Sequence, residues 1–213
     1  MNTEKLTRLL QLASPTLPVG AYSYSQGLEA AIEAGVVHDA ASAGSWIGDV
    51  LRLSVARTDA PIFLRLCCGE ESQMSGNALY LATRETAELR AETGQMGYSL
   101  ARLLGELGID VGLEEPSFPA SMAKAVIAWR IDPHDALVAY LWGWLEKQVM
   151  AAVKAVPLGQ TDGQKLLLAL GDRLEGVARA AAELPDDDIG AFTPGLALLS
   201  SRHETQYSRM FRS

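Results

Sequence analysis

Apolar side chains recur along most of this chain at spacings of three and four residues, which places them on one face of an α-helix. In residues 3–12 this spacing predicts a short amphipathic helix with Leu6, Leu9 and Leu10 pointing inward. Further helices are expected at about residues 24–35, 40–53 and 59–68. No segment shows the alternation of apolar and polar residues that is typical of a β-strand. The pattern predicts an all-α, single-domain helical bundle of eight or more helices.

The longest periodic segment covers residues 77–107. Its apolar seam alternates spacings of four and three, a pattern that packs against another helix, and consists of Ala82, Thr86, Leu89, Thr93, Met96, Leu100, Leu103 and Leu107. A charged face, expected to be solvated or to form the rim of an interface, carries Arg84, Glu85, Glu88, Arg90 and Glu92. Gly94 and Gly97 indicate either a break in the helix or the close approach of another backbone or a partner. The polar residues 69–76 before this segment are expected to form a loop.

Two more helix starts are marked by a capping residue followed by proline, at Ser117 and at Asp132. The helix after Asp132 is apolar on nearly all sides over residues 136–145, which is typical of the buried centre of a bundle. A final long helix is predicted through residues 164–179. It is expected to turn its apolar side chains inward, namely Leu166, Leu167, Leu170, Leu174 and Val177, and to carry a Glu175–Arg179 pair on its surface.

Turn-forming residues interrupt these helices at 14–27 and 156–164. In the first interruption, Gly20 is expected in the left-handed region. Capping-box spacing occurs in both, at Ser23 with Gln26 and at Thr161 with Gln164, and predicts helix starts there. Elsewhere Gly35 is expected to end a helix, and Asp39 and Asp59 to cap helix starts.

Composition narrows the class of protein. The chain has 213 residues, of which 48% are hydrophobic and 21% charged, and its net charge of −8 argues against nucleic acid as a main partner. The first residues lack the layout of a signal peptide, and no apolar run reaches the length of about 20 residues that a membrane span needs. The two cysteines are adjacent, so a disulfide framework is not expected. A cytoplasmic protein, without membrane contact, is predicted.

The charge changes sign near the C-terminus. Residues 183–188 carry four acidic side chains, whereas residues 200–213 carry three arginines and one glutamate together with Tyr207, Met210 and Phe211. A basic, aromatic terminus on an acidic protein is a poor candidate for the core. Aromatic residues and arginine are enriched at interfaces, so residues 200–213 are predicted to be a partner-binding tail.

No group of residues in the sequence supports an enzyme. His38, His134 and His203 are widely spaced, and Cys67-Cys68 lacks the spacing with which two thiolates hold one metal ion. The segment Ser23-Tyr24-Ser25-Gln26-Gly27 resembles a serine nucleophile motif, but no strand precedes it, so its serines are better explained as helix caps. Residues 159–165 depart from the phosphate-binding loop, so no nucleotide is expected. Neither a cofactor nor a metal site is predicted, and the remaining features describe a helical interaction protein.

Four stretches, in order along nearly the whole chain, resemble the urease accessory protein UreF family. They are Ser14 to Glu29 (SPTLPVGAYSYSQGLE), Thr83 to Arg90 (TRETAELR) with Gln95-Met96-Gly97, Pro157 to Gln164 (PLGQTDGQ), and His203-Glu204 with Gln206 to Ser213 (QYSRMFRS). Two small departures are Ala21, where many members have glycine, and Met210, where leucine is common.

This resemblance implies an all-α homodimer that is not itself a catalyst. Members of the family bind the accessory protein UreD, called UreH in some organisms, and the complex recruits the GTPase UreG. The assembly docks on apo-urease and helps to deliver nickel to its active site, with the UreF-like protein as scaffold and gate. The family tail is thought to become ordered on the UreD-type partner. An alternative from a different class is a metallochaperone that binds nickel itself, through histidines at a dimer seam.

The resemblance and the tail composition together select candidate partner-binding residues. Those expected to contact the UreD-type protein are Tyr207, Arg209, Phe211 and Arg212. Those expected on a GTPase-recruiting or dimer surface are Arg84, Glu85, Glu88, Arg90 and Lys165. The family stretches add Tyr22, Tyr24, Gln26, Glu29, His203, Glu204 and Ser213. For the two tyrosines, packing and interface roles are both open.

Overall fold

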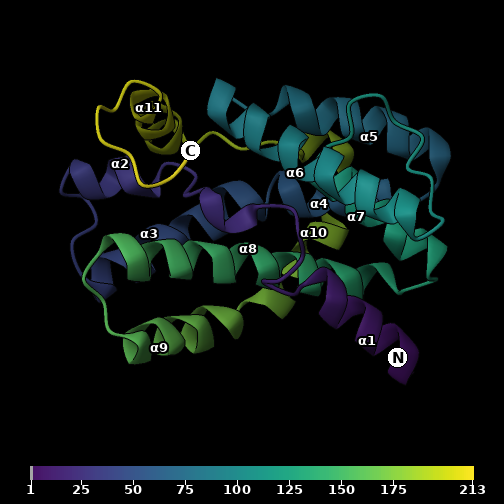
Figure 1. The fold of residues 1–213 in the computed structure, drawn as a ribbon, viewed down its shortest axis with the longest axis horizontal. Helices are drawn as coiled ribbons and strands as arrows, with labels where there is room; N and C mark the ends of the chain where they lie inside the picture. Colours follow the sequence, from purple (N-terminus) through teal and green to yellow (C-terminus); the bar gives the residue numbers. More distant parts are fainter. Residues whose placement is uncertain (1) are drawn as a thin grey trace.

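The computed structural model of the protein describes residues 2–213, apart from the side chain of residue 70, and within them it contains helices and no strand (Figure 1). The α-helices are α1 (Thr3–Leu12), α2 (Leu28–Glu33), α3 (Ala40–Val50), α4 (Asp59–Leu66), α5 (Glu70–Ala82), α6 (Ala87–Glu106), α7 (Phe118–Ala128), α8 (Pro133–Ala155), α9 (Gln160–Gly171), α10 (Leu174–Glu183) and α11 (Pro194–His203). Shorter turns are a π-helix at Leu51–Val55 and 3-10 helices at Ala21–Ser23 and Asp186–Asp188. The all-α prediction is confirmed.

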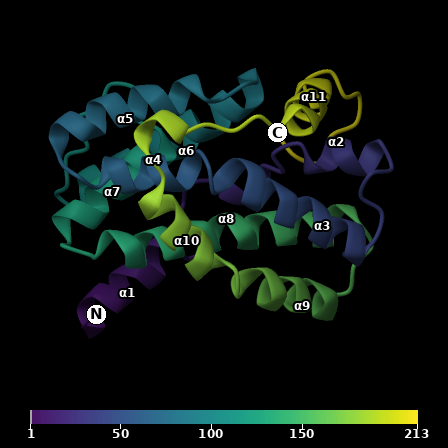
Figure 2. The ribbon, with the colours of Figure 1, turned by 180° about the vertical axis from the view of Figure 1, so that it is seen from behind.

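Helix α8 is the centre of the bundle. It contacts α1, α2, α3, α4, α7, α9 and α10, and it crosses the middle of the molecule in both views (Figures 1 and 2). Its side chains Leu137, Leu141, Leu145 and Val149 are fully buried. The predicted buried central helix is therefore confirmed, although it continues to Ala155. None of the described helices is long and apolar enough to cross a membrane.

Three of the predicted helix caps are present. The side chain of Asp39 accepts a hydrogen bond from the Ser42 amide at 2.8 Å and, with the Ser42 hydroxyl, completes a capping box. Ser117 caps α7 and Asp132 caps α8, each just before a proline in the first turn. These starts were predictable because a cap satisfies helix amides that have no partner within the helix.

Both predicted capping boxes, at Ser23 and at Thr161, are wrong. Residues 21–23 form a 3-10 turn, and α2 begins only at Leu28, because Gln26 and Gly27 both have positive φ, at 53° and 79°. Helix α9 begins at Gln160, without a side-chain cap. The left-handed conformations expected of Gly20 and Gly35 are confirmed, with φ of 74° and 73°.

The segment expected to be a loop before residue 77 is helical. Helix α5 begins directly after Gly69, whose φ is 124°. Two of its polar side chains are buried and serve its packing: Gln73 donates to the carbonyl oxygen of Leu66 at 2.5 Å, and Asn77 donates to that of Glu115 at 2.9 Å. These polar residues form a helix that is held in place by side-chain hydrogen bonds. A search for apolar periodicity does not detect such a helix.

The predicted seam over residues 77–107 spans two helices. It is interrupted after Ala82, and Thr86 caps α6 by accepting from the Leu89 amide at 3.2 Å. Neither Gly94 nor Gly97 breaks α6. A Cβ at Gly97 would lie 2.0 Å from the carbonyl oxygen of Pro116, whereas one at Gly94 would meet nothing within 4 Å. Of the two alternatives for these glycines, the close approach of another backbone therefore explains why residue 97 is a glycine.

Two expected packing faces differ in the structure. In α1, Leu9 and Leu12 are buried against the bundle, whereas Leu6 and Leu10 are 42% and 62% exposed, so their predicted inward orientation is wrong. The predicted helix through residues 164–179 is divided into α9 and α10. Buried Leu167 and Leu170 lie in α9, and buried Leu174 begins α10.

Candidate interaction site

The C-terminal segment, residues 204–213, folds back from the end of α11 onto α2 and α6 (Figures 1 and 2). The Arg212 amide donates to the carbonyl oxygen of Ser23 at 2.8 Å. The amides of Ser25 and Gln26 donate to the carbonyl oxygen of Ser213 at 2.7 and 3.1 Å. The turn before α2 therefore presents two successive N–H groups to the segment, which is a common way to hold a chain by its backbone.

Glu29, at the start of α2, binds the segment through its carboxylate. One oxygen accepts from the Met210 amide at 2.7 Å, and the other accepts from the Phe211 amide at 2.9 Å. The Phe211 side chain is 6% exposed and packs with the core, as one of the buried anchors of the segment. The prediction that the terminus stays out of the core is therefore wrong for part of it: Ser200, His203, Phe211 and Ser213 are all buried.

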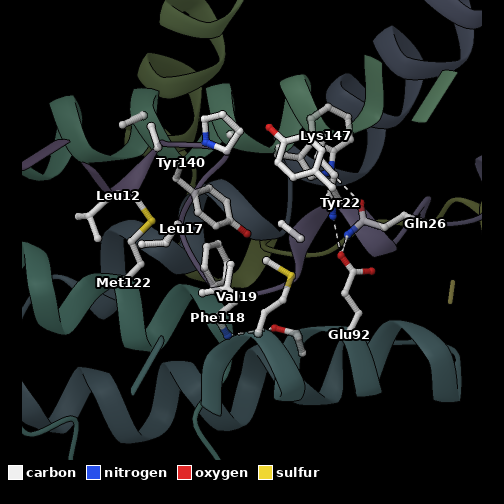
Figure 3. A pocket seen from close by; sticks show the side chains of 18 of the residues that line it. Leu12, Leu17, Val19, Tyr22, Gln26, Glu92, Phe118, Met122, Tyr140 and Lys147 are labelled. Carbon is white, nitrogen blue, oxygen red and sulfur yellow. Dashed lines mark hydrogen bonds and ion pairs between the residues drawn. The ribbon is translucent and has the colours of Figure 1, made fainter. Parts of the chain in front are cut away.

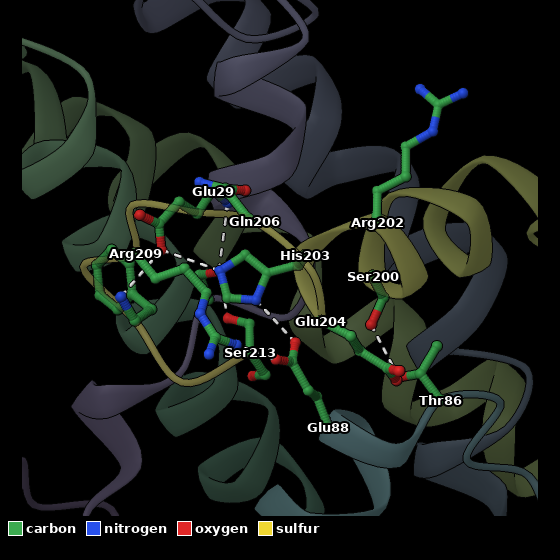
Figure 4. A network of polar contacts seen from close by, with 12 residues as sticks. Glu29, Thr86, Glu88, Ser200, Arg202, His203, Glu204, Gln206, Arg209 and Ser213 are labelled. Atoms are coloured by element: carbon green, nitrogen blue, oxygen red, sulfur yellow. Dashed lines mark hydrogen bonds and ion pairs between the residues drawn. The ribbon is translucent and has the colours of Figure 1, made fainter.

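His203, the last residue of α11, joins the start of the segment to α2 and α6 (Figure 4). Its imidazole is fully buried, with Nδ1 2.7 Å from a carboxylate oxygen of Glu88 and Nε2 3.1 Å from one of Glu29. The other Glu88 oxygen accepts from Arg209 at 2.8 Å. The residue after His203, Glu204, accepts from the Ala87 amide at 2.9 Å and so supports the first turn of α6.

A buried ion pair lies beneath the segment. Lys147 of α8 is 2.5 Å from Glu92 of α6, and both side chains are about 5% exposed. Glu92 also accepts from the side-chain amide of Gln26 at 2.9 Å and from the hydroxyl of Ser213 at 3.1 Å. Glu92 was expected on a charged surface face, and this expectation is wrong because its hydrogen-bond partners come from three other parts of the chain.

A second buried ion pair joins Arg84 to Asp59. Their nearest atoms are 3.2 Å apart, and Asp59 also accepts from the hydroxyl of Tyr80 at 2.9 Å. Burial lowers the pKa of Arg84, but Asp59 and the hydroxyls of Tyr80 and Tyr140 outweigh it and raise this pKa overall. The expected surface role of Arg84 is therefore wrong, and so is the predicted capping role of Asp59, because both side chains serve the core.

The N-terminal turn closes a small cavity over α6, α7 and α8 (Figure 3). Its volume is about 70 Å³; Leu12, Leu17 and Val19 line one side, and Glu92 and Lys147 lie at its polar end. The two candidate tyrosines differ here. The first, Tyr22, is half-buried and donates to Glu146 at 2.9 Å, and burial, followed by Glu146, raises its pKa. The second, Tyr24, is 4% exposed and donates to Gln95, so it has a packing role.

The candidate partner-binding residues therefore divide into groups. Four exposed side chains, here called the outward tail face, are Arg202 of α11 and Tyr207, Met210 and Arg212 of the segment. Glu85 and Arg90 are exposed near the start of α6. Lys165 is exposed on α9, where it pairs with Asp162 at 3.1 Å. Helix α9 lies at the edge of the molecule away from α11 in both views (Figures 1 and 2). The structure does not bring Lys165 to the tail.

Sequence reasoning missed Lys147, which pairs with Glu92 beneath the tail. A signal was present, because a lysine in the middle of a largely apolar helix requires a partner when that part of the helix is buried. The partner itself, Glu92, lies 55 residues away and was not predictable from the local pattern.

The described residues contain no group of three histidine, cysteine or acidic side chains arranged to hold a metal ion. His134 pairs with Glu175 on the surface at 3.1 Å, and the predicted pair of Glu175 with Arg179 is confirmed at 3.0 Å. Burial, followed by Cys68, raises the pKa of Cys67 to about 12, which keeps this thiol protonated at neutral pH.

The fold and site define an all-helical protein whose C-terminal segment is fastened to the body by polar contacts and presents a basic, aromatic face. Residues 37–171 match the family model UreF. The chain is 55% identical to the urease accessory protein UreF of Azoarcus sp. (strain BH72), covering 98% of this chain and 95% of that protein. It is 50% identical to the urease accessory protein UreF of Dechloromonas aromatica (strain RCB), with 98% of each chain covered. The chain belongs to the UreF family, which confirms the resemblance found in the sequence.

Proposed function

We propose that this chain acts in urease maturation as a non-catalytic scaffold. In this proposal it binds a UreD/UreH-type accessory protein, recruits the GTPase UreG, and gates the GTP-dependent insertion of nickel, the cargo, into apo-urease. The observation that carries the maturation role is the 55% identity, over 98% of the chain, to a urease accessory protein. The finer partner roles rest on the family resemblance and on the layout of the tail.

The outward tail face supports the partner role. Tyr207 is fully exposed and Met210 is 63% exposed, although both come shortly after the buried His203 in the sequence. Arg202 and Arg212 are exposed beside them on a protein of net charge −8. A surface that is locally basic and apolar on an acidic protein suits a partner with an apolar pocket and an acidic rim.

The anchors of the segment support the same role in another way. In the free chain Glu29 holds the backbone amides of Met210 and Phe211, and Glu88 holds the side chains of His203 and Arg209. A preformed binding segment loses less conformational freedom on association than a disordered one, which strengthens binding. Of the residues predicted to contact the partner, Phe211 is therefore assigned to anchoring and Tyr207 to contact.

Replacing Tyr207 by alanine is expected to weaken binding to the UreD-type protein by about 2 kcal/mol, or about 30-fold, because aromatic anchors dominate such interfaces. Calorimetry or quantitative co-purification with that protein measures the effect. A matched control is Phe192→Ala, which removes an aromatic ring that is 88% exposed but lies outside the tail. Equal affinities for wild type and Tyr207→Ala would contradict the assignment.

The maturation role itself is tested by activation of apo-urease in a host that lacks the corresponding gene. The full chain is expected to restore activity, and a chain without residues 204–213 is expected to fail while keeping its helical content. No restoration by the full chain would overturn the proposed function. Restoration by the shortened chain would leave that function intact and overturn the role of the tail.

GTPase recruitment or dimer contact is assigned to exposed residues outside the tail, which are Glu85 and Arg90 near the start of α6 and, at a separate place, Lys165 on α9. The pair of Lys165 with Asp162 is highly exposed, and exposed pairs contribute at most about 1 kcal/mol to folding. A Lys165→Ala variant is therefore expected to fold normally and to recruit the GTPase less well, with Lys154→Ala as a matched surface control. Undiminished recruitment by Lys165→Ala would remove this residue from the assignment.

Nothing in the geometry favours the alternative of a histidine-based nickel carrier. The ring nitrogens of His203 both contact carboxylates, and His134 pairs with Glu175. The homodimer stays a prediction, which sedimentation of the purified chain tests.

A further inference from the structure

A second cavity lies where the start of α11 meets the body of the bundle. Part of its lining comes from the linker to α11 and from the first turn of that helix, namely Gly190, Ala191, Thr193 and Leu196. The rest comes from the π-helix and from the first residues of α4, the start of α6 and the middle of α8. Helix α11 itself packs mainly on α2 and α6, at one corner of the molecule (Figures 1 and 2). An occupant of this cavity therefore contacts both α11 and the body.

The size of this cavity limits the size of its occupant. Its volume is about 220 Å³, compared with about 70 Å³ for the cavity beneath the N-terminal turn. Pockets for drug-sized molecules begin at roughly 300 Å³, whereas an engineered cavity of about 150 Å³ in another protein admits benzene. The space therefore suits a molecule that consists of one ring, or a short chain, with a small substituent.

Much of the lining is apolar. The indole N–H of Trp144 already donates to the side chain of Gln26 at 2.8 Å, so the indole ring remains for apolar contact. Burial of apolar surface drives the binding of small molecules, and their polar groups then fix the orientation. The apolar residues of the lining are Val50, Val55, Leu89, Trp144 and Leu196. The occupant is therefore expected to carry a hydrocarbon part.

Thr58 gives the lining a polar group without a partner. The residue is 3% exposed, and its hydroxyl oxygen has no hydrogen-bond partner among the described residues. Thr58 is the N-cap of α4, but its side chain does not make the cap hydrogen bond that is usual for a threonine there. A buried hydroxyl without a partner is costly, and a hydroxyl can both donate and accept. A ligand with a hydroxyl or amide group would satisfy it.

The charged groups of the lining are not free to bind an ion. All three guanidinium nitrogens of Arg84 already donate, at 3.0–3.4 Å, to Asp59, Thr83 or Tyr80. Asp59 in turn accepts from Arg84 and from the hydroxyl of Tyr80. A charged ligand would have to disrupt this buried pair, which is strongly unfavourable. The remaining charged residue of the lining, Glu85, is exposed. The lining therefore favours a neutral ligand.

From this lining we propose that the cavity binds a small neutral molecule that combines an apolar ring or chain with one hydroxyl or amide group. The polar group bonds to the hydroxyl of Thr58, and the apolar part lies against Leu89, Trp144 and Leu196. A ligand that binds only when α11 is docked stabilises the docked state. The inference does not depend on the proposed function.

Titration of the full chain with benzyl alcohol, followed by nuclear magnetic resonance, tests the site. Benzyl alcohol has one ring and one hydroxyl, and it is expected to cause saturable shifts at the indole N–H of Trp144 and at the amides of Thr58 and Leu196. A Kd of about 1 mM is expected for so small a ligand. Benzoate and benzylamine have the same size but are charged at neutral pH, and they are expected not to bind. No saturable shift with benzyl alcohol, or tighter binding of either charged compound, would overturn the proposal.

The role of the hydroxyl is tested by Thr58→Val, which keeps the shape of the side chain. The variant is expected to fold, because the hydroxyl that it removes has no partner in the chain. Its affinity for benzyl alcohol is expected to fall by about tenfold relative to its affinity for toluene, which has no hydroxyl. Thr161→Val, at an exposed position of α9, is the matched control and is expected to change neither affinity. Equal changes for both ligands in Thr58→Val would overturn the proposal.

Hydrogen exchange in the wild-type chain tests the link to α11 and does not require a variant. At a benzyl alcohol concentration of about ten times the Kd, the protection of the α11 amides is expected to rise by about tenfold. The first turn of α9 serves as the reference, because α9 contributes no residue to the lining. Unchanged protection of α11 in the saturated protein would overturn the link between the ligand and this helix.

Discussion

Replacing Asp59 by alanine is expected to lower the free energy of unfolding by about 3–5 kcal/mol. The change leaves the guanidinium of Arg84, whose side chain is only 10% exposed, without its countercharge. It also removes the acceptor for the hydroxyl of Tyr80. A buried charge that loses its partner retains the full cost of leaving water, which is why this single substitution outweighs most surface changes.

Chemical denaturation of the purified variants measures this effect. Asp39→Ala is a suitable control, because it removes an acidic residue from an exposed helix cap and is expected to cost about 1 kcal/mol. A double variant, Asp59→Leu with Arg84→Met, is expected to recover much of the loss, because no charge then remains buried. Equal losses for Asp59→Ala and Asp39→Ala would contradict the view that the buried ion pair dominates.

Gly97→Ala is the other substitution with a large expected effect, a loss of about 3 kcal/mol at the upper end of the range for overpacking. The new Cβ would lie 2.0 Å from the carbonyl oxygen of Pro116, 2.5 Å from the carbonyl carbon of Ser117 and 2.8 Å from the amide nitrogen of Phe118. These are backbone atoms, so no side-chain rotation relieves the overlap. Helix α6 and the start of α7 would have to move apart.

The same helix provides the control. Gly94→Ala meets nothing within 4 Å and is expected to stabilise the protein by about 0.5–1 kcal/mol, since alanine restricts the unfolded chain and favours the helix. Opposite shifts of the two denaturation midpoints are the expected result. A stabilising effect of Gly97→Ala would show that α6 and α7 are not held as closely as the structure describes.

The parts of the fold that the sequence predicted are those decided by neighbours along the chain. Helix starts at Asp39, Ser117 and Asp132 depend on a side chain and amides two or three residues away, so local chemistry is sufficient. Burial of α8 follows from the apolar residues around its circumference. The resemblance to the UreF family likewise depended only on the order of residues.

The parts that could not be predicted depend on distant partners. Arg84 and Glu92 resemble an exposed charged face until Asp59 and Lys147 are brought to them by the fold. The capping box expected at Ser23 is absent because Gln26 and Gly27 take left-handed conformations there, and the carbonyl oxygen of Ser23 accepts from the distant Arg212 amide. The division of the candidate residues into anchors and exposed side chains therefore needed the structure.

The fold-back of the C-terminal segment has a consequence for the order in which the molecule is completed. His203 contacts Glu29 across 174 residues of sequence, and Ser213 contacts Ser25 across 188. Contacts of such separation require the intervening chain to be in place, because closing so long a loop costs entropy that the local contacts do not repay. The exposed side of the tail is thus displayed only on a body whose helices have already assembled. A partner that recognises this side would distinguish finished molecules from unfinished ones.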